Sequence, residues 1–133
     1  MSYTNYHIVP EQSAVTVEGR GGTFYRATRY NIEIGNNATI MLSSQPNGVG
    51  KISVDDIVEV TARDCAGDEF ANYRHDFSNG CSEPINPIDP VNLTTDEGFD
   101  VLRGKTVSVE IKLLDLCGGG IYSTDFYFCV SES

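Results

Sequence analysis

Carboxylates are the side chains of this sequence that are best suited to chemistry, and most of them lie in the middle of the chain. Residues 55–100 hold 12 of the 19 Asp and Glu residues but only two basic residues, Arg63 and Arg74. Carboxylate oxygens in irregular loops suit Ca²⁺, which takes about six to eight oxygen ligands. The candidate calcium ligands are Asp64, Asp68, Glu69 and Asp76 in one stretch and Asp89, Asp96, Glu97 and Asp100 in another. The chain has no EF-hand pattern, so this prediction rests on composition, and the alternative is a solvated acidic rim.

A second candidate site combines arginine with aromatic residues. Arg20, Arg26 and Arg29 are three of only nine basic residues, and they alternate with Phe24, Tyr25 and Tyr30. Arginine and tyrosine anchor protein partners and stack on ligands. The predicted ligand-binding residues are Tyr25, Arg26, Arg29 and Tyr30. The alternative is that these arginines form ion pairs with the acidic segment.

Four cysteines, at positions 65, 81, 117 and 129, allow several kinds of chemistry. The chain contains no C-x-x-C motif and neither histidine stands at a zinc-ligand spacing, which disfavours zinc. A disulfide between Cys65 and Cys81 would close a short loop in the acidic segment. The other possibility is that the cysteines are free thiols.

Catalytic motifs are scarce. The only histidines are His7 and His75, and neither G-x-S-x-G nor H-E-x-x-H occurs. His75 lies close to Cys81 in sequence, but a solvated loop histidine is the favoured explanation. We therefore expect a protein that is not an enzyme, and a small hydrolase using His75 is the least favoured alternative.

The elements that must position these residues are β-strands. Apolar and polar residues alternate with a period of two, as in half-buried strands. This alternation covers residues 13–18, 23–34, 39–43, 51–54, 57–63, 106–113 and 122–130. The pattern predicts one all-β domain over residues 1–133, an antiparallel β-sandwich of the immunoglobulin-like or jelly-roll-like kind with seven to nine strands. At most one short helical turn is expected, at Thr94–Arg103, where Thr94 and Glu97 match a capping box.

Two details of strand geometry follow from the alternation. In residues 23–34, Phe24, Thr28, Tyr30, Ile32 and Ile34 would share one face, interrupted by Arg26. Residues 106–113 and 122–130 would form a hairpin around Gly118-Gly119, in which Ile111 faces Phe126 and Val109 faces Phe128. That register places Cys117 and Cys129 about 30 Å apart and excludes a disulfide between them. Residues 64–99 are expected to be mainly irregular, with Pro84, Pro87 and Pro90 at every third position.

The negative net charge of the chain narrows the classes of partner that we expect. The net charge of −10 opposes binding to nucleic acid and to acidic membranes. The chain has no apolar run long enough to span a bilayer and no signal peptide at its start. These features suit a cytoplasmic protein or one exported without a classical leader, and the compartment itself stays unknown.

The function expected from these features is a non-enzymatic binding module with a carbohydrate or protein surface as its ligand. Calcium is the one cofactor that the composition favours. The alternative is a self-assembling structural subunit, such as a filament, inclusion or virion-surface protein, that forms homo-oligomers through exposed edge strands.

Overall fold

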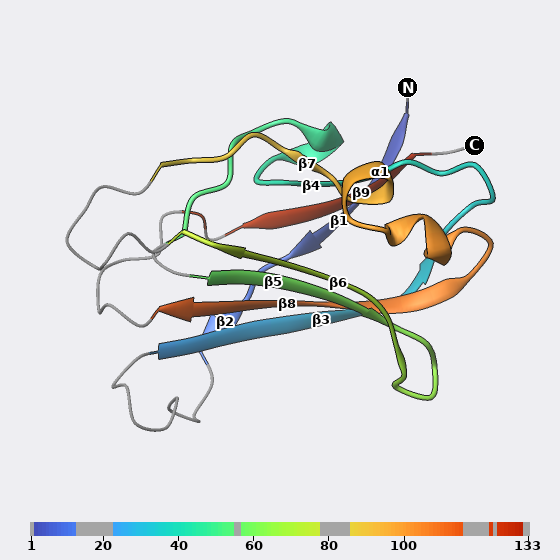
Figure 1. Ribbon diagram of the computed structural model, residues 1–133, viewed down its shortest axis with the longest axis horizontal. Helices are drawn as coiled ribbons and strands as arrows, with labels where there is room; N and C mark the ends of the chain where they lie inside the picture. The colour runs from blue at the N-terminus through green and yellow to red at the C-terminus, as the bar shows by residue number, and fades with distance from the viewer. Residues whose placement is uncertain are drawn as a thin grey trace.

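The structure is a computed structural model that describes residues 2–12, 23–54, 57–77, 86–115, 123 and 125–131. Two antiparallel sheets pack face to face (Figure 1). The four-stranded sheet has the order β1 (Tyr3–Ile8), β9 (Phe126–Ser131), β4 (Ile40–Ser43) and β7 (Val91–Asn92). The five-stranded sheet has the order β2 (Glu11–Gln12), β3 (Thr23–Glu33), β8 (Thr106–Asp115), β5 (Ile57–Arg63) and β6 (Glu69–Asp76). The predicted all-β antiparallel sandwich with seven to nine strands is confirmed, since the described residues contain nine strands.

The core lies between the two sheets because each strand presents one apolar face inward. Alternate residues of β8, from Val107 to Leu113, are buried, as are Phe126, Phe128 and Val130 of β9. These are the two apolar faces that the alternation predicted. Side chains of successive strand residues point to opposite faces, so the residues between them on β8 lie on the outside of the five-stranded sheet.

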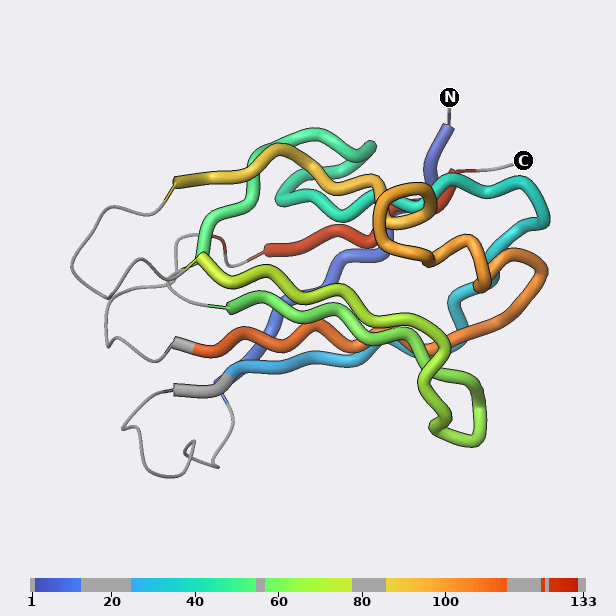
Figure 2. The backbone as a smooth tube through the Cα atoms, viewed as in Figure 1, coloured from blue at the N-terminus to red at the C-terminus, as the bar shows by residue number. Residues whose placement is uncertain are grey.

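One side of the sandwich is closed by helical turns. The helix α1 (Leu93–Asp96) contacts β4 and β7, and the 3₁₀ turn η2 (Phe99–Leu102) contacts β6. The side chains of Leu93, Phe99 and Leu102 are fully buried. Figure 2 shows these turns at the side of the sandwich, near the ends of the sheets. The helical turn was therefore predicted in the right place, but its N-cap is Asn92, whose side chain accepts hydrogen bonds from the backbone N–H groups of Thr94 and Thr95.

The predicted hairpin between residues 106–113 and 122–130 is wrong. β8 pairs with β3 and β5, whereas β9 pairs with β1 and β4 in the other sheet. The apolar faces of β8 and β9 meet across the core instead of lying side by side, and period-two alternation is satisfied equally by both arrangements. Cys117 and the glycines of the predicted turn lie outside the described residues. Cys129 is fully buried, and its Sγ lies 3.7 Å from Ser43 Oγ.

The predicted single face of residues 23–34 is also wrong, because β3 contains a bulge. Its register against β8 shifts between Arg29 and Ile32. Tyr30 is exposed before the shift, while Ile32 and Ile34 are buried after it. Asn31 has a left-handed φ of 59°, a conformation that asparagine tolerates better than most residues. The extra residue at the bulge reverses the inward and outward positions.

Other strand predictions have mixed outcomes. The strands predicted at residues 39–43 and 57–63 correspond to β4 and β5, whereas Ile52 forms only an isolated bridge with Ile88. The segment 13–18 lies outside the described residues. β6 was missed, because its outer positions are polar and the carboxylates around it suggested an irregular segment. Its inward residues Ala71 and Tyr73 nevertheless alternate with exposed Asn72 and Arg74.

Candidate functional site

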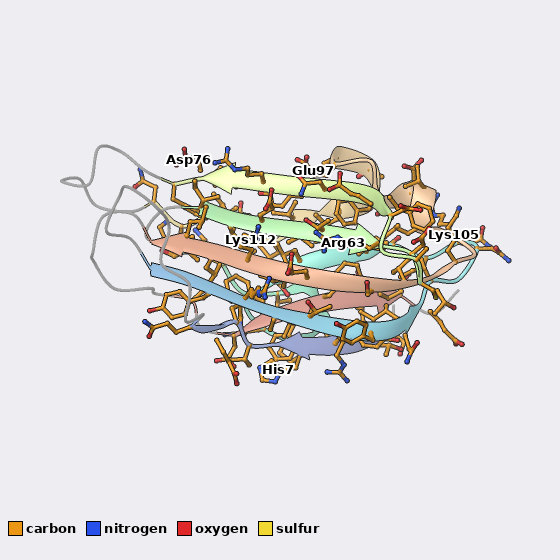
Figure 3. All side chains as sticks on the ribbon, turned by 90° about the horizontal axis from the view of Figure 1, so that it is seen from below. His7, Arg63, Asp76, Glu97, Lys105 and Lys112 are labelled. Carbon is orange, nitrogen blue, oxygen red and sulfur yellow. The ribbon has the colours of Figure 1, made fainter. Side chains whose placement is uncertain are left out.

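The outer face of the five-stranded sheet is a polar surface with ordered side-chain contacts. Directly opposite residues of antiparallel strands share a face. Lys112 of β8 therefore lies beside Glu59 of β5, with Lys112 Nζ 3.7 Å from Glu59 Oε1. The side-chain amide of Asn72 on β6 donates hydrogen bonds to Glu59 Oε2 at 3.2 Å and to Thr61 Oγ1 at 2.9 Å. Figure 3 views the sheet from this side, with Lys112 and Arg63 on the near face.

Glu110 of β8 lies at the centre of this surface. It stands opposite Thr28 on β3 and Thr61 on β5, and its side chain is only 11 % exposed. Arg63 Nη1 donates to Glu110 Oε1 at 3.4 Å, and Arg26 Nη1 lies 4.0 Å from Glu110 Oε2. A partly buried carboxylate needs such partners because burial removes its hydration. The contacts hold Arg26 and Arg63 on either side of one carboxylate.

A groove of about 450 Å³ lies beside this arginine–glutamate cluster. Three strands and one turn contribute to it: β3, β5, β8 and the turn that joins β5 to β6. The charged side chains along it are Arg26, Arg63, Asp64 and Glu110, and the neutral polar ones include Thr28, Asn31, Thr106 and Ser108. Tyr30 supplies the aromatic ring, with 69 % of its surface exposed. Aromatic rings combined with a few placed polar groups are typical of small-ligand sites.

The turn between β5 and β6 forms one wall of the groove and is tied together by Asp64. Asp64 Oδ1 accepts hydrogen bonds from the backbone N–H groups of Ala66 and Asp68, both at 2.9 Å. The backbone N–H of Asp64 donates to the carbonyl of Asp68, also at 2.9 Å. This Asx-type turn projects beyond the sheet in Figure 2. Asp64 Oδ1 therefore holds the turn.

Cys65 occupies the same turn as an exposed free thiol, which agrees with the free-thiol alternative for this residue. Cys81 itself lies outside the described residues.

The four predicted ligand-binding residues are divided between two places. Arg26 and Tyr30 line the groove. Tyr25 and Arg29 stand opposite the buried residues Leu113 and Val109, on the other face of β3. Arg29 Nη1 donates to the carbonyl of His7 at 3.1 Å. Its guanidinium also lies 5.6 Å from the centroid of the Tyr6 ring, so Arg29 joins β3 of one sheet to β1 of the other.

The predicted calcium ligands do not come together. Asp64, Asp68 and Glu69 lie at the β5–β6 turn, whereas Asp76 ends β6 at its other end, about 23 Å away. Asp96, Glu97 and Asp100 belong to α1 and η2, and Asp89 pairs with Lys51 at 3.9 Å. Figure 3 shows Asp76 and Glu97 well apart. Within the described ranges, no three His, Cys, Asp or Glu side chains form a group that could hold a metal ion.

The two histidines lie apart from the groove. His7 Nε2 lies 2.7 Å from Asp125 Oδ1, and its ring stacks on Tyr127 with centroids 4.6 Å apart. His75 packs edge-on against Phe77. Neither contact supplies the nucleophile that a hydrolytic site would add to a histidine.

Two groove residues, Arg63 and Glu110, were not among the predicted site residues. The sequence does contain part of the signal, because Glu110 lies on the polar face of a strongly alternating strand. Recognising the site also requires the strand order β3-β8-β5, which brings Arg26 and Arg63 to either side of Glu110.

Comparison of the chain with models of known protein families and with curated protein sequences found no match. The groove therefore has to be interpreted from its own chemistry. In the described part of the chain, no helix has the length and apolar character needed to span a bilayer.

Proposed function

We propose that this protein is a non-enzymatic binding module that binds a carbohydrate in the groove on the outer face of its five-stranded sheet. The observation that carries the proposal is the position of the exposed Tyr30 ring in a groove that also contains the Arg26–Glu110–Arg63 cluster. A sugar ring has an apolar face that packs on an aromatic ring, and hydroxyls at its edge that bond to charged side chains.

The bulge in β3 supports this assignment. Bulges redirect side chains next to functional sites, and this one allows Tyr30 to stay in solvent while Ile32, two residues later, is buried. Asn31 at the bulge has a left-handed φ. A non-glycine residue in this conformation costs free energy, and exposure of the Tyr30 ring supplies a reason for retaining it.

A glycan array followed by isothermal titration calorimetry tests the proposal. We expect Tyr30→Ala to weaken binding about tenfold, the equivalent of about 1.4 kcal/mol. Tyr3→Ala is the matched control, because Tyr3 lies on the outer face of the other sheet, and it should leave affinity unchanged. Equal affinities for the wild type and Tyr30→Ala would place the binding site elsewhere.

Arginine variants provide a second, charge-matched comparison. Arg26→Gln and Arg74→Gln remove the same charge from the same face of the sheet, but only Arg26 lines the groove. Arg26→Gln should weaken binding and Arg74→Gln should not. A chelator should leave binding unchanged, because the described carboxylates form no metal-binding group. A loss of binding on chelation would favour the calcium-assisted alternative.

Self-assembly through edge strands has weaker support. β6 is the eight-residue edge of the five-stranded sheet. It carries the exposed Arg74, and its register against β5 shifts between Ala62 and Arg63. Charged side chains and bulges on an edge strand both oppose the addition of another strand. Light scattering over a range of concentrations separates this alternative from the binding module, which should stay monomeric.

A further inference from the structure

The charges of the groove cancel. Two positive side chains, Arg26 and Arg63, and two negative ones, Glu110 and Asp64, line it. Both arginines already contact the same carboxylate, with N–O distances of 4.0 and 3.4 Å. An anionic ligand would therefore have to compete with Glu110 for these guanidinium groups, because the arginines do not outnumber the carboxylates among the described residues that line the groove.

Hydroxyl groups suit this arrangement better than carboxylates or ammonium groups. Arginine only donates hydrogen bonds and glutamate only accepts them, whereas a hydroxyl does both. A sugar hydroxyl beside the cluster can accept from Arg26 while it or its neighbour donates to Glu110. Around the cluster, Thr28, Asn31 and Ser108 provide further neutral polar groups.

The charge of the whole chain acts in the same direction. Its net charge is −10, and a field of that sign lowers the local concentration of anions and slows their association. An acidic glycan would meet long-range repulsion outside the groove and a compensated charge inside it.

We infer that the groove selects neutral glycans over acidic ones, an inference that rests on the proposed carbohydrate-binding function. The selective element is Glu110. It neutralises one of the two arginines, so that the groove offers hydrogen bonds without a net positive charge.

The test compares neutral hexose oligosaccharides with counterparts in which one hexose is replaced by a hexuronic acid or carries a sulfate. The wild type should bind each neutral glycan at least about tenfold more tightly than its acidic counterpart, because the acidic group displaces a hydrogen bond to a charged group. Tyr30→Ala should weaken binding of the neutral glycans.

Glu110→Gln tests the origin of the selectivity. The substitution keeps the shape of the side chain and leaves the groove with one excess positive charge, so the preference for neutral glycans should shrink about tenfold. Glu59→Gln is the matched control: it removes the same charge from the same face, at a residue that contacts Lys112 outside the groove, and should leave the preference unchanged. Thermal melts verify that both variants fold.

The outcomes separate the two proposals. Tighter binding of acidic glycans, lost in Tyr30→Ala, would overturn the selectivity and leave carbohydrate binding in the groove intact. Binding of no glycan, or binding that does not respond to Tyr30→Ala, would overturn both. The comparison of wild-type affinities decides the selectivity even if Glu110→Gln fails to fold.

Discussion

Tyr73 links the stability of the fold to alkaline pH. It lies on β6 with its ring in the core, only 6 % exposed. Burial, with a smaller contribution from the charge of Glu97, raises the pKa of Tyr73 from 10.0 to about 12. In the unfolded chain the hydroxyl has its ordinary pKa of about 10. Stability is therefore complete below about pH 10 and is lost as the pH rises through about 12, because only the unfolded chain releases the proton in that interval.

The size of the effect follows from the two pKa values. Each pKa unit corresponds to about 1.4 kcal/mol, so the full difference between 10.0 and about 12 amounts to at most about 3 kcal/mol. At about pH 11 the unfolded chain is stabilised by about 1.4 kcal/mol relative to the folded one. For a chain of 133 residues this lowers the melting temperature by about 3–5 °C.

Urea unfolding of the wild type and of Tyr73→Phe at about pH 9 and about pH 11 measures this effect. Phenylalanine keeps the buried ring but cannot ionise, so the variant should lose about 1.4 kcal/mol less than the wild type between the two pH values. The other six tyrosines are present in both proteins, so their contributions cancel in the comparison. Glu97→Gln should reduce the loss slightly, since its charge is the smaller cause. Equal losses in the wild type and Tyr73→Phe would refute the raised pKa.

Two further predictions concern stability. Phe99→Ala should lower the free energy of unfolding in urea by about 3–5 kcal/mol, because the ring is fully buried. Val101→Ala should lower it by less than about 1 kcal/mol, because that side chain is 48 % exposed. Similar losses in the two variants would contradict the role of η2 in the core. Gly50→Ala and Gly67→Ala both place alanine at a positive φ, but only at Gly50 would the new Cβ lie 2.6 Å from Ser44 Oγ. Gly50→Ala should therefore be the less stable by at least about 1 kcal/mol in thermal melts, and the reverse order would show that the Ser44 contact relaxes freely.

The alternation of apolar and polar residues predicted the positions of the strands better than it predicted which strands pair. Val107, Val109 and Ile111 are buried as expected, because each strand of a sandwich needs one apolar face whatever its neighbours are. The predicted pairing of β8 with β9 was wrong for the same reason. An apolar face indicates on which side of the strand the core lies, and it does not indicate which strand is the neighbour in the sheet. β6 was not predicted because its outer positions are polar and only two of its inner positions, Ala71 and Tyr73, are buried.

The candidate site was predictable by residue type and only partly by position. Arg26 and Tyr30 were expected to bind a ligand, and both line the groove. Tyr25 and Arg29 were included because they are neighbours in sequence, although adjacent strand residues point to opposite faces. Arg63 and Glu110 join the site only through the strand order. Alternation within one strand contains no information about strand order.

The bulge in β3 explains why the core and the groove could not both be found by following one alternating pattern. With a period of two throughout, Tyr30 and Ile32 would share a face. Either the ring of Tyr30 would be buried, or Ile32 and Ile34 would be exposed. The extra residue at Asn31 removes this conflict, because positions before it follow one phase and positions after it follow the other. The strand thereby presents Arg26, Thr28 and Tyr30 to solvent, while Ile32 at its end and Ile34 just after it pack in the core.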